Sequence, residues 1–193
     1  MSLAVLIMAA GSSSRFGGCK LLAEVAPGVA LLEHSIQLAM PLQAEFMAIV
    51  SGAWHAEIVA AQQQQRVTAL PLIHNPNWQE GLGSSIAEAV RQLPEDTDQL
   101  LILLADQIAL TTTDLQRLLL ISDPADVVCA EYAGRRGVPA LFRRALFPEL
   151  ISLQGDKGAK QLLYSPSLHI ETLAMPNAEQ DIDTPEALAH YLR

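Results

Sequence analysis

The sequence predicts an α/β protein built on a mostly parallel sheet, and three observations support this fold class. Short apolar runs alternate with helical segments of about a dozen residues, which is the pattern of βαβ units. The first run, Leu3 to Ala9, is apolar throughout, as expected for a strand that is covered on both faces. The 193 residues are 50% apolar and 17% charged, so they can fill the core of one domain spanning residues 1–193.

The expected strands and helices alternate along most of the chain. Strands are expected at residues 3–9, 46–50, 68–74, 100–105, 126–132, 138–142 and 168–174. Helices are expected at residues 30–40, 54–65, 85–93, 114–121, 143–153, about 155–164 and 185–192. The run at 100–105 is the most apolar, so we expect it at the centre of the sheet.

Three helix starts carry capping signals. Ser85 with Glu88, and Thr113 with Gln116, have the spacing of capping boxes. Thr184 is suited to the N-cap of the last helix. These residues set the expected first turns of the helices at 85–93, 114–121 and 185–192.

The alternation breaks once, near residue 134. The sequence Gly-Arg-Arg-Gly at 134–137 predicts a tight turn between the strands at 126–132 and 138–142, which would form a hairpin. The hairpin predicts either an antiparallel strand at the edge of the sheet or an inserted flap.

The loop after the first strand has the composition of a polyphosphate site. Ala10, Gly11 and Ser12 begin a run of small residues whose N–H groups can face a ligand, and the cations Arg15 and Lys20 follow. The loop matches neither the P-loop nor the dinucleotide-binding fingerprint. A glycine-rich and serine-rich connection with two solvated cations is the alternative interpretation.

Acidic residues occupy positions suited to a metal ion. Asp106 follows the predicted central strand, at the edge where open α/β sheets bind ligands. Mg²⁺ prefers carboxylate oxygens together with substrate phosphates. Asp181 and Asp183 lie two residues apart on an extended segment, so they share a side, and either could join Asp106. Alternatively, one of them only supports the N-terminus of the last helix.

A second glycine-containing loop, at 75–85, ends at a predicted helix. Gly81 and Gly83 permit close approach of the backbone to a ligand, and the helix N-terminus offers free N–H groups. Ser84 or Ser85 could therefore contact a ligand, or Ser85 could serve only as the helix cap.

Charge and composition exclude several classes of partner. With 12 basic and 21 acidic residues, the net charge of -9 disfavours binding to nucleic acid or to an anionic membrane surface. No apolar run reaches the length of a membrane span, and the N-terminus lacks the basic start of a secretory signal. Two cysteines are too few for a disulfide framework and favour a cytoplasmic location.

Six motifs together resemble one protein family over most of the chain. They are AAGSSSRFGGCK, NPNWQEGLGSSI, LLADQIAL, GRRGVPALF, GDKGAKQLL and DIDTPEAL. The set is similar to the nucleotidyltransferases of molybdenum-cofactor biosynthesis, closest to the branch that makes the cytidine form of the cofactor and related to the guanylyltransferases. The resemblance implies a three-layer, Rossmann-like fold of the GT-A type with an antiparallel flap.

The same resemblance implies the chemistry and the residues that carry it. CMP would pass from CTP to the phosphate of molybdopterin, or of its molybdenum-loaded form, with release of pyrophosphate. Lys20, Arg15 and Asp106 would be catalytic. Asp106 and Asp183 would bind Mg²⁺, with Asp181 as the alternative second ligand. The nucleotide contacts would be Ala9, Ala10, Gly11, Ser12, Lys20, Gly83, Ser84 and Ser85.

Three positions bear on the choice of substrate. Ala10 resembles the cytidine-using members, since guanosine users tend to have glycine there. Ile108 stands where members often have proline, and Val138 stands where they often have histidine, which leaves the acceptor less certain than the nucleotide. The alternatives are GTP or another acceptor on the same fold, and a non-catalytic carrier that delivers the cofactor to a molybdenum hydroxylase.

Overall fold

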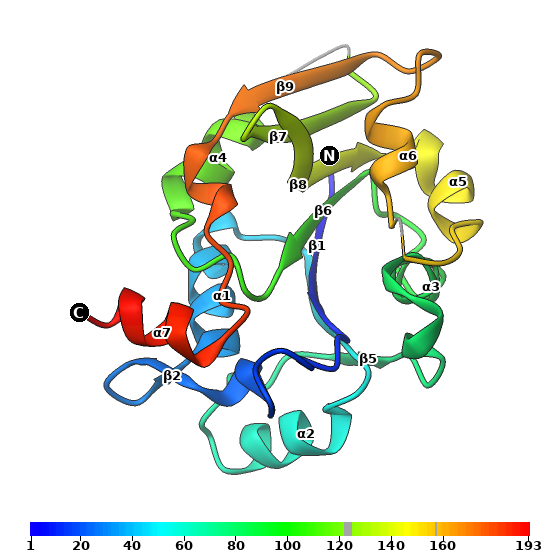
Figure 1. The fold of residues 1–193 in the computed structure, drawn as a ribbon. Coiled ribbons are helices and arrows are strands. Elements are labelled where there is room, and N and C mark those ends of the chain that lie inside the picture. Colours follow the sequence, from blue (N-terminus) through cyan, green and yellow to red (C-terminus); the bar gives the residue numbers. More distant parts are fainter. Residues whose placement is uncertain (122–124, 157) are drawn as a thin grey trace.

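The computed structural model describes residues 1–121, 125–156 and 158–193, and it contains the expected mostly parallel sheet (Figure 1). Seven strands lie in the order β5-β4-β1-β6-β8-β7-β9. Their bounds are β1 Leu3–Ala9, β4 Phe46–Ser51, β5 Leu72–His74, β6 Gln99–Leu104, β7 Val127–Tyr132, β8 Arg135–Arg143 and β9 Ile170–Ala174. A separate small hairpin, β2 Glu24–Ala26 with β3 Val29–Ala30, was not expected from the sequence.

Burial on both faces explains why β1 is apolar throughout. Leu3, Val5, Ile7 and Ala9 face one hydrophobic core, whereas Ala4, Leu6 and Met8 face the other. β1 pairs in parallel with β4 on one side and with β6 on the other. The prediction that the run at 100–105 is central is confirmed, because β6 is the fourth of the seven strands.

Helices cover both faces of the sheet and give three layers. α1 (Leu31–Ala39), α2 (His55–Gln63) and α4 (Thr112–Leu120) pack on one core. α3 (Leu82–Val90), α5 (Phe147–Ile151) and α6 (Lys160–Leu163) pack on the other, at the right of Figure 1. α7 (Pro185–Tyr191) lies at the lower left of the view, beside the small hairpin.

Among the described strands of the seven-stranded sheet, β8 alone runs antiparallel to its neighbours, and it lies inside the sheet and not at its edge. β8 pairs antiparallel with β6 on one side and with β7 on the other, while β7 pairs in parallel with β9. We call the β7–β8 hairpin the flap. The hairpin was predicted correctly, but an edge position was wrong because the order of strands depends on long-range pairing that no local pattern records.

Two capping predictions were wrong in position. α3 begins at Leu82 with Gly81 as its N-cap, three residues before the predicted start. The Ser85 hydroxyl accepts a hydrogen bond from Asn75 Nδ2 (2.9 Å) instead of capping the helix. The cap of α4 is Thr111, whose side chain and backbone exchange hydrogen bonds with Asp114 in a complete capping box.

Other differences concern the lengths of elements. The strand predicted at 68–74 is limited to 72–74, because Gln62 Nε2 bonds the carbonyls of Thr68 and Leu70. The helix predicted at 143–153 is a 3-10 turn at Arg144–Leu146 followed by the short α5. Lys157 of the predicted helix start at 155–160 lies outside the described residues. Within the described ranges, no helix combines the length and apolarity needed to cross a bilayer.

Candidate active site

The loop after β1, residues 10–19, is held firmly against its neighbours. Its carbonyls accept hydrogen bonds from outside the loop: Ala53 N–H donates to Ala10 O (3.1 Å), and Trp54 Nε1 donates to Ser12 O (3.0 Å). Inside the loop, Ser13 has a positive φ of 54°. These contacts fix the loop while its opposite side lines a cavity.

Two glycines show which side of the loop is packed and which is open. A Cβ on Gly52 would lie 2.6 Å from Ala10 O and 2.6 Å from Trp78 Cβ, so this glycine lets the chain at the end of β4 press against the loop. A Cβ on Gly11 would meet no atom within 4 Å. The Gly11 side of the loop is therefore free for a ligand.

Lys20 joins two carboxylates that are far apart in the sequence. Its Nζ lies 2.7 Å from Asp106 Oδ2 and 2.8 Å from Asp183 Oδ1, and its side chain is only 11% exposed. Arg15 Nη2 lies 2.8 Å from the other oxygen of Asp183, on a side chain that is 72% exposed. The loop cations and the two distant aspartates therefore form one cluster, as the sequence predicts.

Backbone contacts between β6 and the C-terminal segment bring the two aspartates together. Gln107 and Asp181 form an isolated antiparallel bridge. On either side of it, Ile182 N–H donates to Asp106 O (3.0 Å) and Ile108 N–H donates to Gln180 O (3.1 Å). The pairing fixes the segment at 180–183 beside the end of the central strand, so that Asp183 reaches Lys20.

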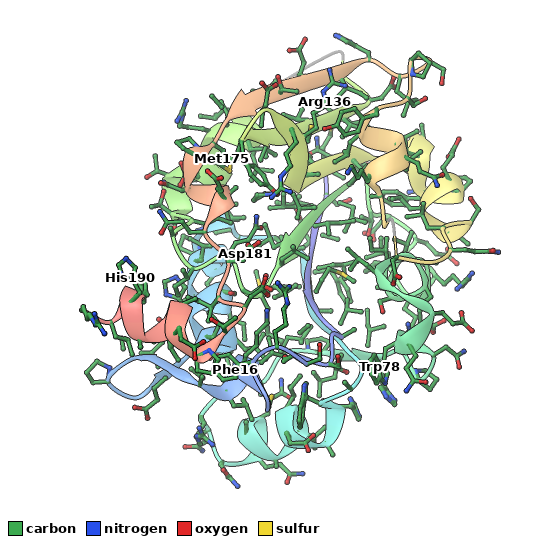
Figure 2. All side chains as sticks on the ribbon, viewed as in Figure 1. Phe16, Trp78, Arg136, Met175, Asp181 and His190 are labelled. Carbon is green, nitrogen blue, oxygen red and sulfur yellow. The ribbon has the colours of Figure 1, made fainter. Side chains whose placement is uncertain are left out.

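A small apolar cluster supports the same meeting point. Ile108 and Ile182 are buried together with Val25 and Leu31, and Phe16 of the first loop packs against them. Figure 2 shows Phe16 below Asp181, near the start of α7. The first loop, the end of β6 and the C-terminal segment thus share a hydrophobic contact beside the charged cluster.

The charges of the cluster shift the pKa values of its own members and of the neighbouring Asp181. Burial by itself lowers the pKa of Lys20, but Asp106 and Asp183 reverse this effect and raise it overall. Burial favours the protonated form of Asp183, yet Lys20 and Arg15 lower its pKa. Burial, with the charges of Asp106 and Asp183, raises the pKa of Asp181 to about 7. The two cations thus stabilise the charged form of Asp183, whereas the environment of Asp181 favours its protonated form.

Two carboxylate oxygens, one in the cluster and one beside it, bear on whether the site can bind a metal ion. Asp106 Oδ1 and Asp181 Oδ1 are buried and have no hydrogen-bond partner among the described residues. Within the same residues, no group of three His, Cys, Asp or Glu side chains is arranged to hold a metal. Mg²⁺ is commonly held by one or two carboxylates together with substrate phosphates, so the donors fit a magnesium ion that arrives with a phosphate ligand.

The cavity above the first loop has a volume of about 370 Å³. The whole cluster belongs to its lining, since Arg15, Lys20, Asp106 and Asp183 all contribute to it. Of the predicted nucleotide contacts, the following line the cavity: Ala9, Ala10, Gly11, Ser12, Lys20 and Ser85.

Three predicted residues do not line this cavity. Gly83 is buried, and its N–H donates to Gly155 O (2.9 Å), so it is not open to a ligand. The Ser84 hydroxyl bonds to Gly81 O (2.9 Å) and faces a second cavity. Asp181 pairs with Gln107 in an isolated antiparallel bridge and is not among the residues that line the cavity. Their predicted contacts with nucleotide or metal stay predictions.

The sequence did not single out other residues of the cavity wall. Trp78, Gln79 and Leu82 line it from the loop before α3, and Asp156 lines it from the loop before α6. The only sequence signal for the close approach of these two loops was the glycine at position 81. A Cβ on Gly81 would clash with Asp156 Oδ1. Nothing local assigns side chains such as Gln79 to a ligand.

Comparisons with known proteins agree on the family and the fold. The sequence signature of the MobA-like NTP transferase domain matches residues 5–171. The purine catabolism protein PucB of Bacillus subtilis is 29% identical over 191 residues, covering 94% of this chain and 91% of that protein. The nicotine blue oxidoreductase of Paenarthrobacter nicotinovorans is 27% identical over 198 residues, covering 97% and 95%.

Solved structures share the fold over the whole chain. The crystal structure of Rv0371c from Mycobacterium tuberculosis superposes with a TM-score of 0.86 at 22% identity, covering 100% of this chain and 97% of that one. A second structure of Rv0371c is a complex with manganese, with a TM-score of 0.78 and 21% identity, covering 100% and 98%.

Proposed function

Since the chain belongs to the family of MobA-like NTP transferase domains, we propose that it transfers CMP from CTP to the phosphate of a molybdopterin-type acceptor. Pyrophosphate is the second product. The observation that carries this proposal is the meeting of Lys20, Asp106 and Asp183 at one end of an open cavity whose other wall is the backbone of residues 9–12.

The first loop is proposed to hold the nucleotide. The carbonyl of Ala10 is occupied by Ala53 N–H, which fixes the backbone that the nucleoside would contact. Arg15 and Lys20 would face the triphosphate, where their charges oppose its repulsion from the aspartates. Gly11, which has open space at its Cβ position, allows the nucleotide to approach the backbone closely.

Asp106 and Asp183 are proposed to hold Mg²⁺, with Asp181 as the alternative second ligand. Support comes from the unpartnered Asp106 Oδ1 and from the ammonium of Lys20, which shows that these two carboxylates can share one cation. When bound, the metal ion would supply charge neutralisation and polarisation of the phosphate oxygens. Manganese bound to Rv0371c supports the choice of a divalent ion.

The reaction needs positioning more than proton transfer. An oxygen of the acceptor phosphate forms a bond to the α-phosphorus of CTP, and the bond from that phosphorus to the bridging β-phosphate oxygen breaks. A phosphate monoester is already anionic near neutral pH, so no general base is required. The protein's part is to align the two substrates and to stabilise the charge that moves to pyrophosphate. Lys20 and Arg15, which both pair with Asp183, are proposed to do this for the leaving group.

Cytidine is proposed as the nucleoside because of Ala10. At this position the chain resembles the cytidine-using members, and Ala10 lines the cavity together with Trp78. The choice of a molybdopterin-type acceptor is based on the resemblance of the six motifs to the family. Among the differences from the family pattern, Val138 in place of histidine bears most on this choice.

The test is release of pyrophosphate by the purified protein. CTP, GTP, ATP and UTP are compared, each with Mg²⁺ and with molybdopterin or another phosphorylated acceptor. The proposal predicts turnover with CTP and molybdopterin above every other pair. Faster turnover with GTP, or with a sugar or polyol phosphate, would correct the substrate. Tight binding of cytidine-containing cofactor without turnover would favour a carrier that serves a molybdenum hydroxylase.

A further inference from the structure

Gln107, the residue after Asp106, has a buried side chain whose two hydrogen-bond donors are both used. The residue is only 2% exposed. Its Nε2 donates to Val138 O (2.9 Å) and to Ala178 O (2.8 Å), which uses both amide hydrogens. Its Oε1 is buried and accepts no hydrogen bond from the described residues. The side chain therefore acts through its donors, which join two segments that are distant in the sequence.

The first of these carbonyls, Val138 O, belongs to a stretch of β8 that the sheet leaves out of its pairing. In the described part of the sheet, the pairing of β6 with β8 ends at Ala140. The pairing of β7 with β8 passes from Ala140 directly to Gly137. Pro139 has no N–H group to donate to a neighbouring strand. Gln107 thus bonds this stretch of the flap with a side chain, from beyond the end of β6.

The second carbonyl, Ala178 O, belongs to the chain that leads to Asp183. Ala178 is fully buried in the 3-10 turn that follows β9. The backbone hydrogen bonds on either side of the bridge between Gln107 and Asp181 already fix residues 180–182. The bond from Gln107 extends this fixed segment back to Ala178. Figure 2 shows the chain descending from Met175 to Asp181.

These contacts require glutamine in a way that the backbone contacts do not. Any residue at position 107 could keep the backbone bonds of its neighbours, but only a side chain with two donors can bond both carbonyls. A glutamate would place an oxygen against Val138 O and Ala178 O, which repel it, and would add a charge beside Asp106. An asparagine is one methylene shorter. Glutamine therefore joins β6, β8 and the C-terminal segment without adding a charge.

The position of Asp183 depends on this segment. Asp183 follows directly after the fixed residues 178–182, and its Oδ1 lies 2.8 Å from Lys20 Nζ. Asp106 Oδ2 lies 2.7 Å from the same nitrogen. Two carboxylates bind one cation only while the chain keeps both within reach of it, and a shift of about 1 Å is enough to weaken such a site strongly.

We propose that Gln107 is a positioning residue: by joining Val138 and Ala178, it sets Asp183 at the distance from Asp106 at which the two carboxylates bind one cation. This inference rests on the proposed metal and nucleotide site. It adds a residue that acts through the two aspartates and does not touch the substrate.

The test compares Gln107→Met with wild type and with Gln62→Met as the matched control. Methionine has a similar length and donates no hydrogen bond. Gln62 Nε2 also donates to two backbone carbonyls, those of Thr68 (3.1 Å) and Leu70 (3.0 Å), but Gln62 does not line the cavity. The dissociation constant for Mn²⁺ is measured at one fixed concentration of CTP, together with the melting temperature and the hydrogen exchange of residues 178–183.

We expect Gln107→Met to weaken Mn²⁺ binding about tenfold or more, because residues that orient metal ligands have effects of this size. Hydrogen exchange of residues 178–183 should become faster in the same variant. Gln62→Met should leave the dissociation constant within about twofold and the exchange of residues 178–183 unchanged, although both variants should melt at a lower temperature. Gln107→Asn keeps the amide on a shorter side chain and should weaken Mn²⁺ binding less than Gln107→Met, so it provides the test if the methionine variant does not fold.

A lower melting temperature alone would mean a purely structural role. Unchanged Mn²⁺ binding, or unchanged exchange of residues 178–183, in the folded Gln107 variants would therefore overturn this inference. If wild type binds Mn²⁺ and releases pyrophosphate in the same experiments, the proposed function stands without it. A wild-type protein that binds no Mn²⁺ with CTP and transfers no nucleotide would overturn both.

Discussion

The first loop and the flap carry their cations in different ways. On the first loop, Lys20 is 11% exposed and bonded to two aspartates, and Arg15 completes the network. On the flap, Arg135 is exposed and stacks on an aromatic ring without an ion-pair partner among the described residues. The loop wall is a fixed, preorganised site, which suits the substrate that all reactions of the family share. Among the described residues, those that line the cavity include none from the flap, so the preorganised charges belong to the first loop.

Replacement of Asp106, the carboxylate after β6, should have the largest effect on activity. Asp106→Asn removes one charge from the metal site and one partner of Lys20. We expect kcat to fall by about 10³-fold or more, because stabilisation of the phosphate charge is the main source of catalysis. Pyrophosphate release and circular dichroism measure activity and fold, and the exposed Asp96→Asn is the control. Near-normal activity would remove Asp106 from the metal site.

The buried cation of the loop wall should come next. Lys20→Met leaves Asp106 and Asp183 without their shared cation and keeps a side chain of similar length. We expect kcat/KM for CTP to fall by about 10²–10³-fold. The variant should also unfold at a lower temperature, since Asp106 loses its cation and Asp183 keeps only the exposed Arg15. Adding Asp183→Asn should restore part of the melting temperature but none of the activity; full recovery of both would contradict the assignment.

The exposed cation of the same wall should matter less. Arg15 pairs with Asp183 on a side chain that is 72% exposed, so solvent and salt screen its charge. We expect Arg15→Ala to raise the KM for CTP about tenfold and to change the melting temperature little. The effect should shrink as salt is raised from low to high concentration. A change in the KM for molybdopterin with no change in the KM for CTP would contradict the proposed contact between Arg15 and the triphosphate.

The packing that fixes the loop wall should give the smallest effect on turnover. Gly52→Ala places a Cβ 2.6 Å from Ala10 O and Trp78 Cβ, where the backbone has to shift. Overpacking of this kind costs about 1–3 kcal/mol of the free energy of unfolding, which lowers the melting temperature by several degrees. The KM for CTP should rise a few-fold. Gly11→Ala is the control for stability, because its Cβ meets no atom within 4 Å.

Much of the fold was predictable because β1 and β6 are apolar on both faces, a pattern that a parallel sheet with helices on both sides requires. Helix starts were less predictable. The run Thr111-Thr112-Thr113 offers two overlapping capping boxes, and only burial of Leu115 and Leu118 selects the first. The place of β8 between β6 and β7 depends on pairings across the sheet, which local patterns do not encode.

The candidate site also has features that the sequence predicted and features that only the structure distinguishes. The cluster of Lys20, Asp106 and Asp183 was predicted, since a loop cation and carboxylates at strand ends mark the ligand edge of such sheets. Ser84 and Ser85 were equivalent predictions, but successive residues of a helix point about 100° apart. Ser85 therefore lines the first cavity and Ser84 the second. Arg135 and Arg136 were likewise equivalent in sequence, and only their contacts distinguish them.

Binding of a divalent ion with the nucleotide tests the central claim most directly. Mn²⁺ can replace Mg²⁺ as a spectroscopic probe, and its electron paramagnetic resonance signal changes when the ion becomes protein-bound. With CTP present, wild type should bind one Mn²⁺, and Asp106→Asn and Asp183→Asn should each lose this binding. Equal Mn²⁺ binding by wild type and both variants in the presence of CTP would contradict the shared metal and nucleotide site.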